Sequence, residues 1–127
     1  MTERSDKPTR IFIVEDEALL AFEMSDVLED LGFEVVGPSN HLEDATVTAA
    51  SSEIDVACLD VNLGEGKTSK PVAEILRDRG IPYVYITAYD AHQITFLQDD
   101  DKVVKKPVSG RKLLDALRIV YPHLEKK

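Results

Sequence analysis

Five short apolar runs, separated by segments with helical spacing, constrain the fold more than any other feature of the sequence. They cover residues 10–14, 33–38, 55–60, 82–87 and 102–106. β-Branched residues are frequent in them, as they are in strands. Strands that alternate with helices pair in parallel, because each crossover returns the chain to the same edge of the sheet. The pattern predicts an α/β fold, a doubly wound sheet of five parallel strands with five helices.

The segments between these runs favour helices to different degrees. Helical spacing of apolar residues is clear over residues 20–31, over 70–80 and after Ser109, a good N-terminal cap. The threonines of residues 41–51 lower the helix propensity, so a weak helix is expected there. Residues 90–98 fit either a poor helix or a turn.

Composition and charge narrow the class of protein. The chain has 127 residues, 43% apolar and 31% charged, which is typical of a globular domain. Residues 1–9 are expected to form a flexible segment before a single domain over residues 10–127. The net charge of −9 argues against direct binding to nucleic acid. We find no signal peptide, no apolar run long enough for membrane insertion and one cysteine, Cys58, so a cytoplasmic protein is expected.

Polar side chains with related chemistry end or directly follow four of the five runs. They are Glu15 with Asp16, then Asp60, Thr87, and Lys105 with Lys106. Because the carboxyl ends of parallel strands meet at one edge of a sheet, we expect these groups to share a site. Crowded carboxylates repel one another unless a cation joins them, and hard oxygen ligands suit Mg²⁺. A lysine and a hydroxyl would complete a site that holds a phosphoryl group on a carboxylate.

Each of these residues also has an ordinary explanation, since acids cap helices and lysines cover sheet edges. The matched set of strand exits favours the site. The two lysines can be separated, because successive strand residues point to opposite faces. Pro107 restricts Lys106 to extended conformations, so we expect Lys106 to face the site and Lys105 to face solvent.

Four motifs resemble the receiver domains of two-component response regulators. They are "VEDE" at 14–17, "LDVNL" at 59–63, "ITA" at 86–88 and "KKP" at 105–107. The resemblance extends from about Arg10 to Tyr121. It implies the flavodoxin-like receiver fold, with a cis peptide bond between Lys106 and Pro107.

The resemblance also implies a role for each site residue. Asp60 would be the phosphoacceptor and a ligand of Mg²⁺. Asp16 would bind the metal directly, Glu15 through a water molecule, and Asn62 through its backbone carbonyl. Thr87 and Lys106 would contact the phosphoryl group.

The aromatic residues depart from the usual receiver pattern. Many receivers carry an aromatic switch residue where this chain has Val103. Tyr85 and Tyr89 are therefore candidate signalling aromatics, although Tyr85 fits a core position equally well. The stretches "LDVNLGEGKTSKPVAEIL" and "GIPYVYITAY" are similar to the FATGUY subgroup of receivers, which prefers glycine where this chain has Ala88.

The function implied is that of a single-domain response regulator with no output domain, a phosphoacceptor rather than an enzyme. A sensor histidine kinase or a phosphotransfer protein would donate the phosphoryl group. The chain would then signal by contact with a downstream protein, or act as a phosphate relay or sink.

Two other functions fit the pattern less well. A Mg²⁺-dependent aspartyl-phosphate phosphatase needs a general acid two residues after its nucleophile, where this chain has Asn62. A nucleotide or flavin binder needs a glycine-containing phosphate loop after the first strand. That segment reads "VEDEALL", which is acidic and has no glycine.

Overall fold

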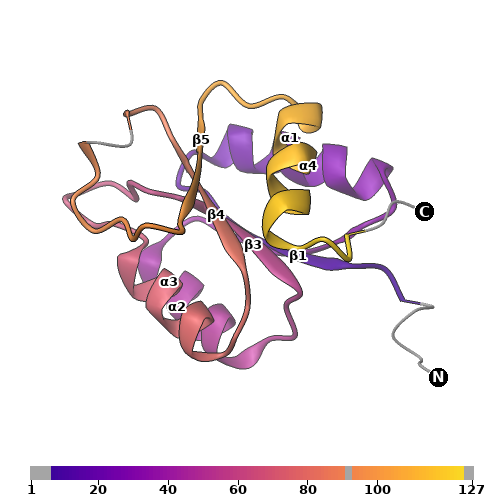
Figure 1. The fold of residues 1–127 in the computed structure, drawn as a ribbon, viewed down its shortest axis with the longest axis horizontal. Coiled ribbons are helices and arrows are strands. Elements are labelled where there is room, and N and C mark those ends of the chain that lie inside the picture. The colour runs from indigo at the N-terminus through magenta and orange to yellow at the C-terminus, as the bar shows by residue number, and fades with distance from the viewer. Residues whose placement is uncertain (1–6, 91–92, 125–127) are drawn as a thin grey trace.

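The computed structural model of the chain describes residues 7–90 and 93–124. Within these residues, five parallel strands form one sheet in the order β2-β1-β3-β4-β5 (Figure 1). The strands are β1 Arg10–Val14, β2 Glu34–Ser39, β3 Val56–Asp60, β4 Tyr83–Thr87 and β5 Lys102–Lys105. The predicted doubly wound parallel sheet is confirmed.

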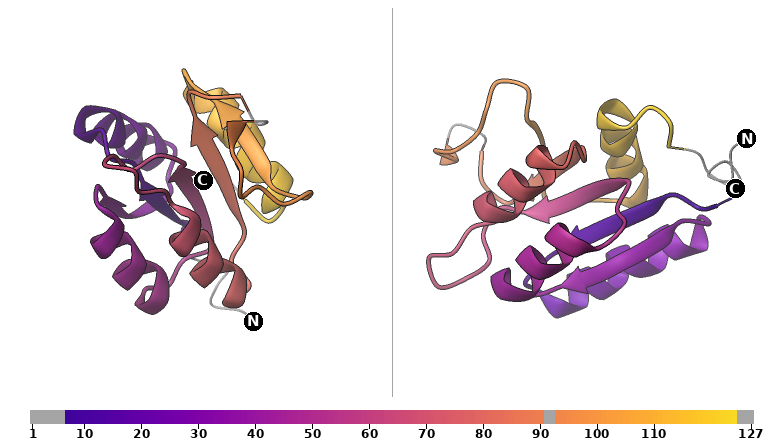
Figure 2. Two further views of the ribbon diagram at one scale, coloured as in Figure 1. Left: turned by 90° about the vertical axis from the view of Figure 1, so that its left-hand side faces the viewer. Right: turned by 90° about the horizontal axis from the view of Figure 1, so that it is seen from below.

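Helices cover both faces of the sheet (Figures 1 and 2). They are α1 Ala18–Asp30, α2 Leu42–Ser51, α3 Lys70–Asp78 and α4 Gly110–Val120. Helices α1 and α4 pack on one face, and α2 and α3 pack on the other. Among the described residues, no helix combines the length and the apolar character needed to cross a membrane.

Alternation along the strands divides the core into two layers. In β1, Phe12 and Val14 face the layer under α2 and α3, whereas Ile11 and Ile13 face the layer under α1 and α4. Every residue of the central strand β3 is buried, including Cys58. A strand covered on both faces leaves its polar end residue little freedom, which is how β3 positions Asp60.

The expectation of five helices was wrong for the described residues, which contain four. The parts of the β4–β5 connection that the structure describes, residues 88–90 and 93–101, contain turns instead of a fifth α-helix. Side chains there bind backbone N–H groups: the Gln93 amide accepts from Asp90 N at 2.8 Å, and Asp101 Oδ2 accepts from Gln98 N at 2.9 Å. Such local bonds compete with helical ones. Residues 91–92 of the expected helix lie outside the described residues.

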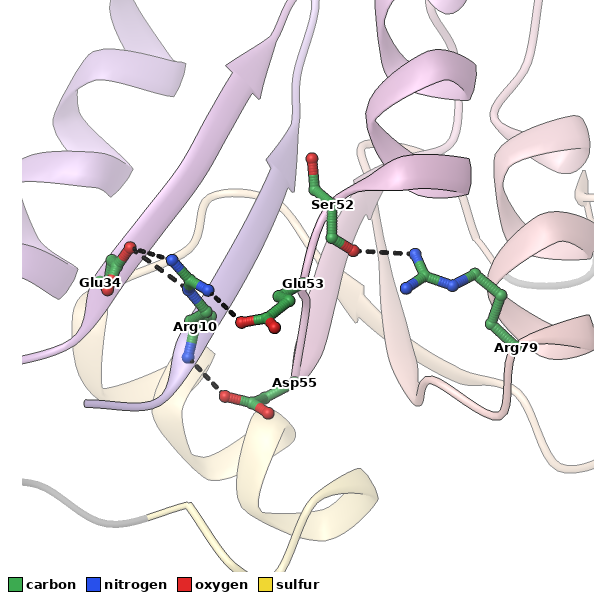
Figure 3. A network of polar contacts seen from close by, with 6 residues as sticks. All are labelled: Arg10, Glu34, Ser52, Glu53, Asp55 and Arg79. Atoms are coloured by element: carbon green, nitrogen blue, oxygen red, sulfur yellow. Dashed lines mark hydrogen bonds and ion pairs between the residues drawn. The ribbon is translucent and has the colours of Figure 1, made fainter. Parts of the chain in front are cut away.

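A polar network ties the amino ends of three neighbouring segments together (Figure 3). The Arg10 guanidinium pairs with Glu34 at 2.9 Å and with Glu53 at 2.5 Å. The Arg10 backbone N donates to Asp55 Oδ2 at 2.8 Å. Arg10 therefore links the start of β1 to the start of β2 and to the segment that precedes β3.

Candidate functional site

Three carboxylates meet at the carboxyl edge of the sheet. Glu15 and Asp16 directly follow β1, and Asp60 ends the neighbouring strand β3. One oxygen from each of the three lies within 4.8 Å of the others. Glu15 and Asp60 are buried and Asp16 is exposed, so the cluster opens to solvent on one side.

Lys106 is the cation that faces this cluster. Its Nζ lies 3.2 Å from Glu15 Oε1 and 3.6 Å from Asp60 Oδ1. Lys105 instead points away, with an exposed side chain whose Nζ lies 2.5 Å from Asp90 Oδ1. The structure therefore places the two lysines as strand alternation predicts, and the expected cis bond between Lys106 and Pro107 is confirmed.

The charges of the cluster change how its groups bind protons. Burial raises the pKa of Asp60 well above its ordinary value, and the nearby carboxylates of Glu15 and Asp16 raise it further, while Lys106 opposes them. Burial lowers the pKa of Lys106, but the charges of Asp60 and Glu15 outweigh burial and raise it overall. A second cation beside the acids would therefore favour an ionised Asp60.

Glu15 supplies a test of whether a metal ion suits the site. Its Oε2 accepts a hydrogen bond from Glu17 N at 3.1 Å. Its Oε1 is buried and accepts no hydrogen bond, although it lies within ion-pair distance of Lys106. A buried carboxylate oxygen without a hydrogen-bond donor, beside two further carboxylates, matches the oxygen-only chemistry of Mg²⁺. The residues present thus fit the metal.

Thr87 and Asn62 complete the set of strand exits. Thr87 ends β4 and is buried, and its hydroxyl accepts a hydrogen bond from Tyr89 N at 3.0 Å. Asn62 lies two residues after Asp60 and forms an antiparallel bridge with Thr68 across the β3–α3 loop. Both residues lie at the same edge of the sheet as Asp60.

The two candidate signalling tyrosines differ in their surroundings. Tyr85 is 1% exposed, and its ring makes edge-to-face contacts with Tyr83 at 5.3 Å and with Phe96 at 5.7 Å between centroids. Tyr89 is 50% exposed. The structure places Tyr85 in the core and Tyr89 on the surface next to Thr87.

The sequence patterns did not single out two residues that lie beside Glu15 and Asp16. Asn40 Nδ2 donates to the carbonyl oxygen of Glu15 at 2.8 Å. Gly64 has a φ of +83°, and a Cβ there would lie 3.6 Å from Asp16 Oδ2. The two glycines of "NLGEG" were a visible signal for Gly64. No pattern in the sequence points to Asn40.

Comparison of the sequence and of the structure with known proteins identifies receiver domains as similar to this chain. A family model described as "Response regulator receiver domain" matches residues 11–118. The solution structure of SdrG from Sphingomonas melonis Fr1 is 37% identical, with a TM-score of 0.73, and the match covers 89% of this chain and 96% of SdrG.

More distant relatives extend the comparison. The transcriptional regulatory protein PdtaR from Mycobacterium tuberculosis is 27% identical over 88% of this chain and 56% of its own length. The chain therefore spans about half the length of this curated relative. A response regulator protein from Burkholderia pseudomallei, whose crystal structure has a phosphorylated aspartic acid and a calcium ion, shares the fold. It is 20% identical, with a TM-score of 0.70 and coverage of 86% of this chain and 66% of that one.

Proposed function

The chain belongs to the family of response regulator receiver domains, and on this premise we propose that Asp60 accepts a phosphoryl group with Mg²⁺ as cofactor. The donor would be a sensor histidine kinase or a phosphotransfer protein. The observation that carries the proposal is the cluster of Glu15, Asp16 and Asp60 facing Lys106. A receiver of this kind is a phosphoacceptor and not an enzyme that turns over a separate substrate.

In the proposed phosphoryl transfer, each side chain of the site would have a different role. An ionised oxygen of Asp60 attacks the phosphorus of the donor phosphohistidine, the new P–O bond forms as the P–N bond breaks, and the bonding electrons leave with the imidazole. Lys106, whose Nζ lies 3.6 Å from Asp60 Oδ1, would offset the charge of the phosphoryl oxygens. The hydroxyl of Thr87 supplies a hydrogen-bond donor. Asp16, Asp60, the Asn62 carbonyl and, through a water molecule, Glu15 would hold Mg²⁺, which would supply further positive charge.

Asn62 favours the phosphoacceptor over a phosphatase. In a phosphatase, a general acid at this position would protonate the leaving group, and an amide has no acidic proton to give. Asn62 is exposed and lies in the loop that follows β3. The position is therefore one that a general acid could use, but this chain has an amide there.

Phosphorylation would be read by contact with another protein or passed on in a relay. The stretches "LDVNLGEGKTSKPVAEIL" and "GIPYVYITAY" resemble the FATGUY subgroup, which prefers glycine where this chain has Ala88, and membership of that subgroup remains a prediction. We infer no DNA contact by this domain itself, because its net charge is −9.

The test is to incubate the protein with acetyl phosphate and Mg²⁺ and to locate the label by mass spectrometry. We expect one phosphoryl group, on Asp60, and none when Mg²⁺ is chelated. Asp60→Asn should not be labelled, whereas Asp26→Asn, an exposed acid on α1, should be labelled like the wild type. Labelling of Asp60→Asn at the wild-type level would refute the assignment.

A further inference from the structure

A bulge in β2 brings two consecutive residues against the backbone of Glu15. Two steps along β1, from Phe12 to Val14, are matched by three steps along β2. Gly37 lies in the bulge with a φ of +90°, and a Cβ there would lie 2.9 Å from Ser39 N. The extra residue turns the end of β2 toward the end of β1, where the acids of the site begin.

Both backbone polar groups of Glu15 are bound by this turn. Glu15 N donates to Ser39 O at 3.0 Å, and Asn40 Nδ2 donates to Glu15 O at 2.8 Å. The second bond matters more for the site, because the Glu15 carbonyl belongs to the planar peptide group that joins Glu15 to Asp16. The Asn40 amide therefore orients the unit that carries two of the three acids.

Asn40 does not serve the helix that follows it. Asparagine is a preferred N-terminal cap, but α2 is capped at His41, which makes no side-chain cap hydrogen bond. The Asn40 side chain is partly buried and reaches a residue 25 positions earlier instead. The Asn40 amide is therefore used on the backbone of Glu15, at the candidate metal site, and not on α2.

We propose that Asn40 is a positioning residue for the metal site, holding Glu15 and Asp16 in the arrangement that Mg²⁺ needs. This inference rests on the proposed function, since it concerns the same acids. Without the hydrogen bond, the Glu15–Asp16 peptide can rotate, and the metal must then restrict it on binding. Removing one hydrogen bond of this kind should weaken Mg²⁺ binding by about fivefold.

The experiment compares Asn40→Ala with Thr46→Ala by titrating each with Mg²⁺ and following amide chemical shifts. Thr46 Oγ1 donates to Glu43 O at 2.9 Å within α2, so its variant also loses one side-chain-to-backbone hydrogen bond, but away from the acids. We expect the Mg²⁺ dissociation constant to rise about fivefold for Asn40→Ala and to stay unchanged for Thr46→Ala. Thermal unfolding without Mg²⁺ reports the purely structural effect of each change.

Each outcome decides between positioning and simple support of the fold. A folded Asn40→Ala variant that binds Mg²⁺ like the wild type would overturn the proposal. If Asn40→Ala does not fold, Asn40→Ser is judged by the same criterion. Titration of the wild type and of Asp16→Asn separates this inference from the proposed function. If the wild type binds no Mg²⁺, or Asp16→Asn binds it equally well, the metal site itself is wrong and the role of Asn40 falls with it.

Discussion

Neighbouring side chains at the carboxyl edge of the sheet have different partners, and the adjacent Lys105 and Lys106 show this most directly. We predict that Lys106→Ala still binds Mg²⁺ but loses the conformational response to a phosphoryl mimic, because Lys106 alone of the pair faces Asp60. Lys105→Ala should respond like the wild type, since its partner is Asp90. The measurement is the change in amide chemical shifts when beryllofluoride is added to each variant. A response lost in Lys105→Ala and kept in Lys106→Ala would reverse the assignment.

Crowding of the acids has a consequence for stability without metal. Three carboxylates within 4.8 Å of one another face one lysine, so replacing Asp60 by a neutral amide removes repulsion. We expect Asp60→Asn to raise the free energy of unfolding on the order of 1 kcal/mol in EDTA, which is a few degrees in the unfolding midpoint. Saturating Mg²⁺ should stabilise the wild type more and shrink the difference.

Thermal unfolding with and without Mg²⁺ checks this expectation. Asp26→Asn, which removes an exposed charge outside the cluster, is the matched control and should change little in either condition. A midpoint of Asp60→Asn at or below that of the wild type in EDTA would contradict the idea that the acids repel one another.

At the scale of elements, the loop between β3 and α3 stores backbone strain next to the site. Lys67 N donates to Gly64 O at 2.8 Å, and the two residues between them, Glu65 and Gly66, have φ values of 55° and 76°. Positive φ at both central positions favours Asn-Gly, whereas a glutamate there is unfavourable. We predict that Glu65→Asn raises the free energy of unfolding by roughly 0.5–1 kcal/mol.

Urea denaturation measures this change. Gly66→Ala is the opposing control, because it puts a Cβ on a residue with a φ of 76° and should destabilise the protein. An Asn variant that unfolds at lower urea than the wild type would show that the Glu65 side chain makes a compensating contact.

The connection between β4 and β5 shows the limit of helix patterns. Arg77 on α3 donates hydrogen bonds to the hydroxyl of Tyr83 and, at 3.2 Å, to Asp101 Oδ1. Tyr83 in turn donates to the same oxygen of Asp101 at 3.1 Å. Phe96 from the connection packs on Tyr85. Most of these contacts join segments distant in sequence, so spacing within residues 90–98 could not reveal the turns seen at the described residues 88–90 and 93–101.

At the scale of the whole molecule, Arg10 should make stability depend on salt. Its guanidinium pairs with Glu34 at the start of β2 and with Glu53 before β3. Because water and salt reach these side chains, each pair contributes little to stability and its contribution depends on salt. We predict that Arg10→Ala lowers the free energy of unfolding more at low salt than at high salt, where the pairs are screened.

Urea unfolding at two salt concentrations tests this. Arg118→Ala is the control, since Arg118 pairs with Asp115 at 3.7 Å on the same helix and this variant should lose less stability. An Arg10→Ala loss that is equal at both salt concentrations would assign the effect to packing of the arginine stem instead of charge.

The sequence predicted where in the fold the candidate site lies, but it did not predict all of the contacts that shape the site. Alternation of strands and helices implies that strand exits share an edge, so the order of residues along the chain was enough to group Asp16, Asp60 and Lys106. The contact from Asn40 could not be predicted in this way, because it depends on one extra residue in β2 and on the φ of Gly37. Pairing rules predict which strands are neighbours, whereas a bulge changes which atoms meet.

The distance along the chain between the acids and their lysine shapes how the protein is made. Glu15 and Lys106 are 91 positions apart, so the acids leave the ribosome long before the cation that balances them. Until β5 pairs with β4, the nascent domain holds crowded carboxylates without that internal counter-charge. Pairing of the last strand therefore completes the sheet and neutralises part of its charge together.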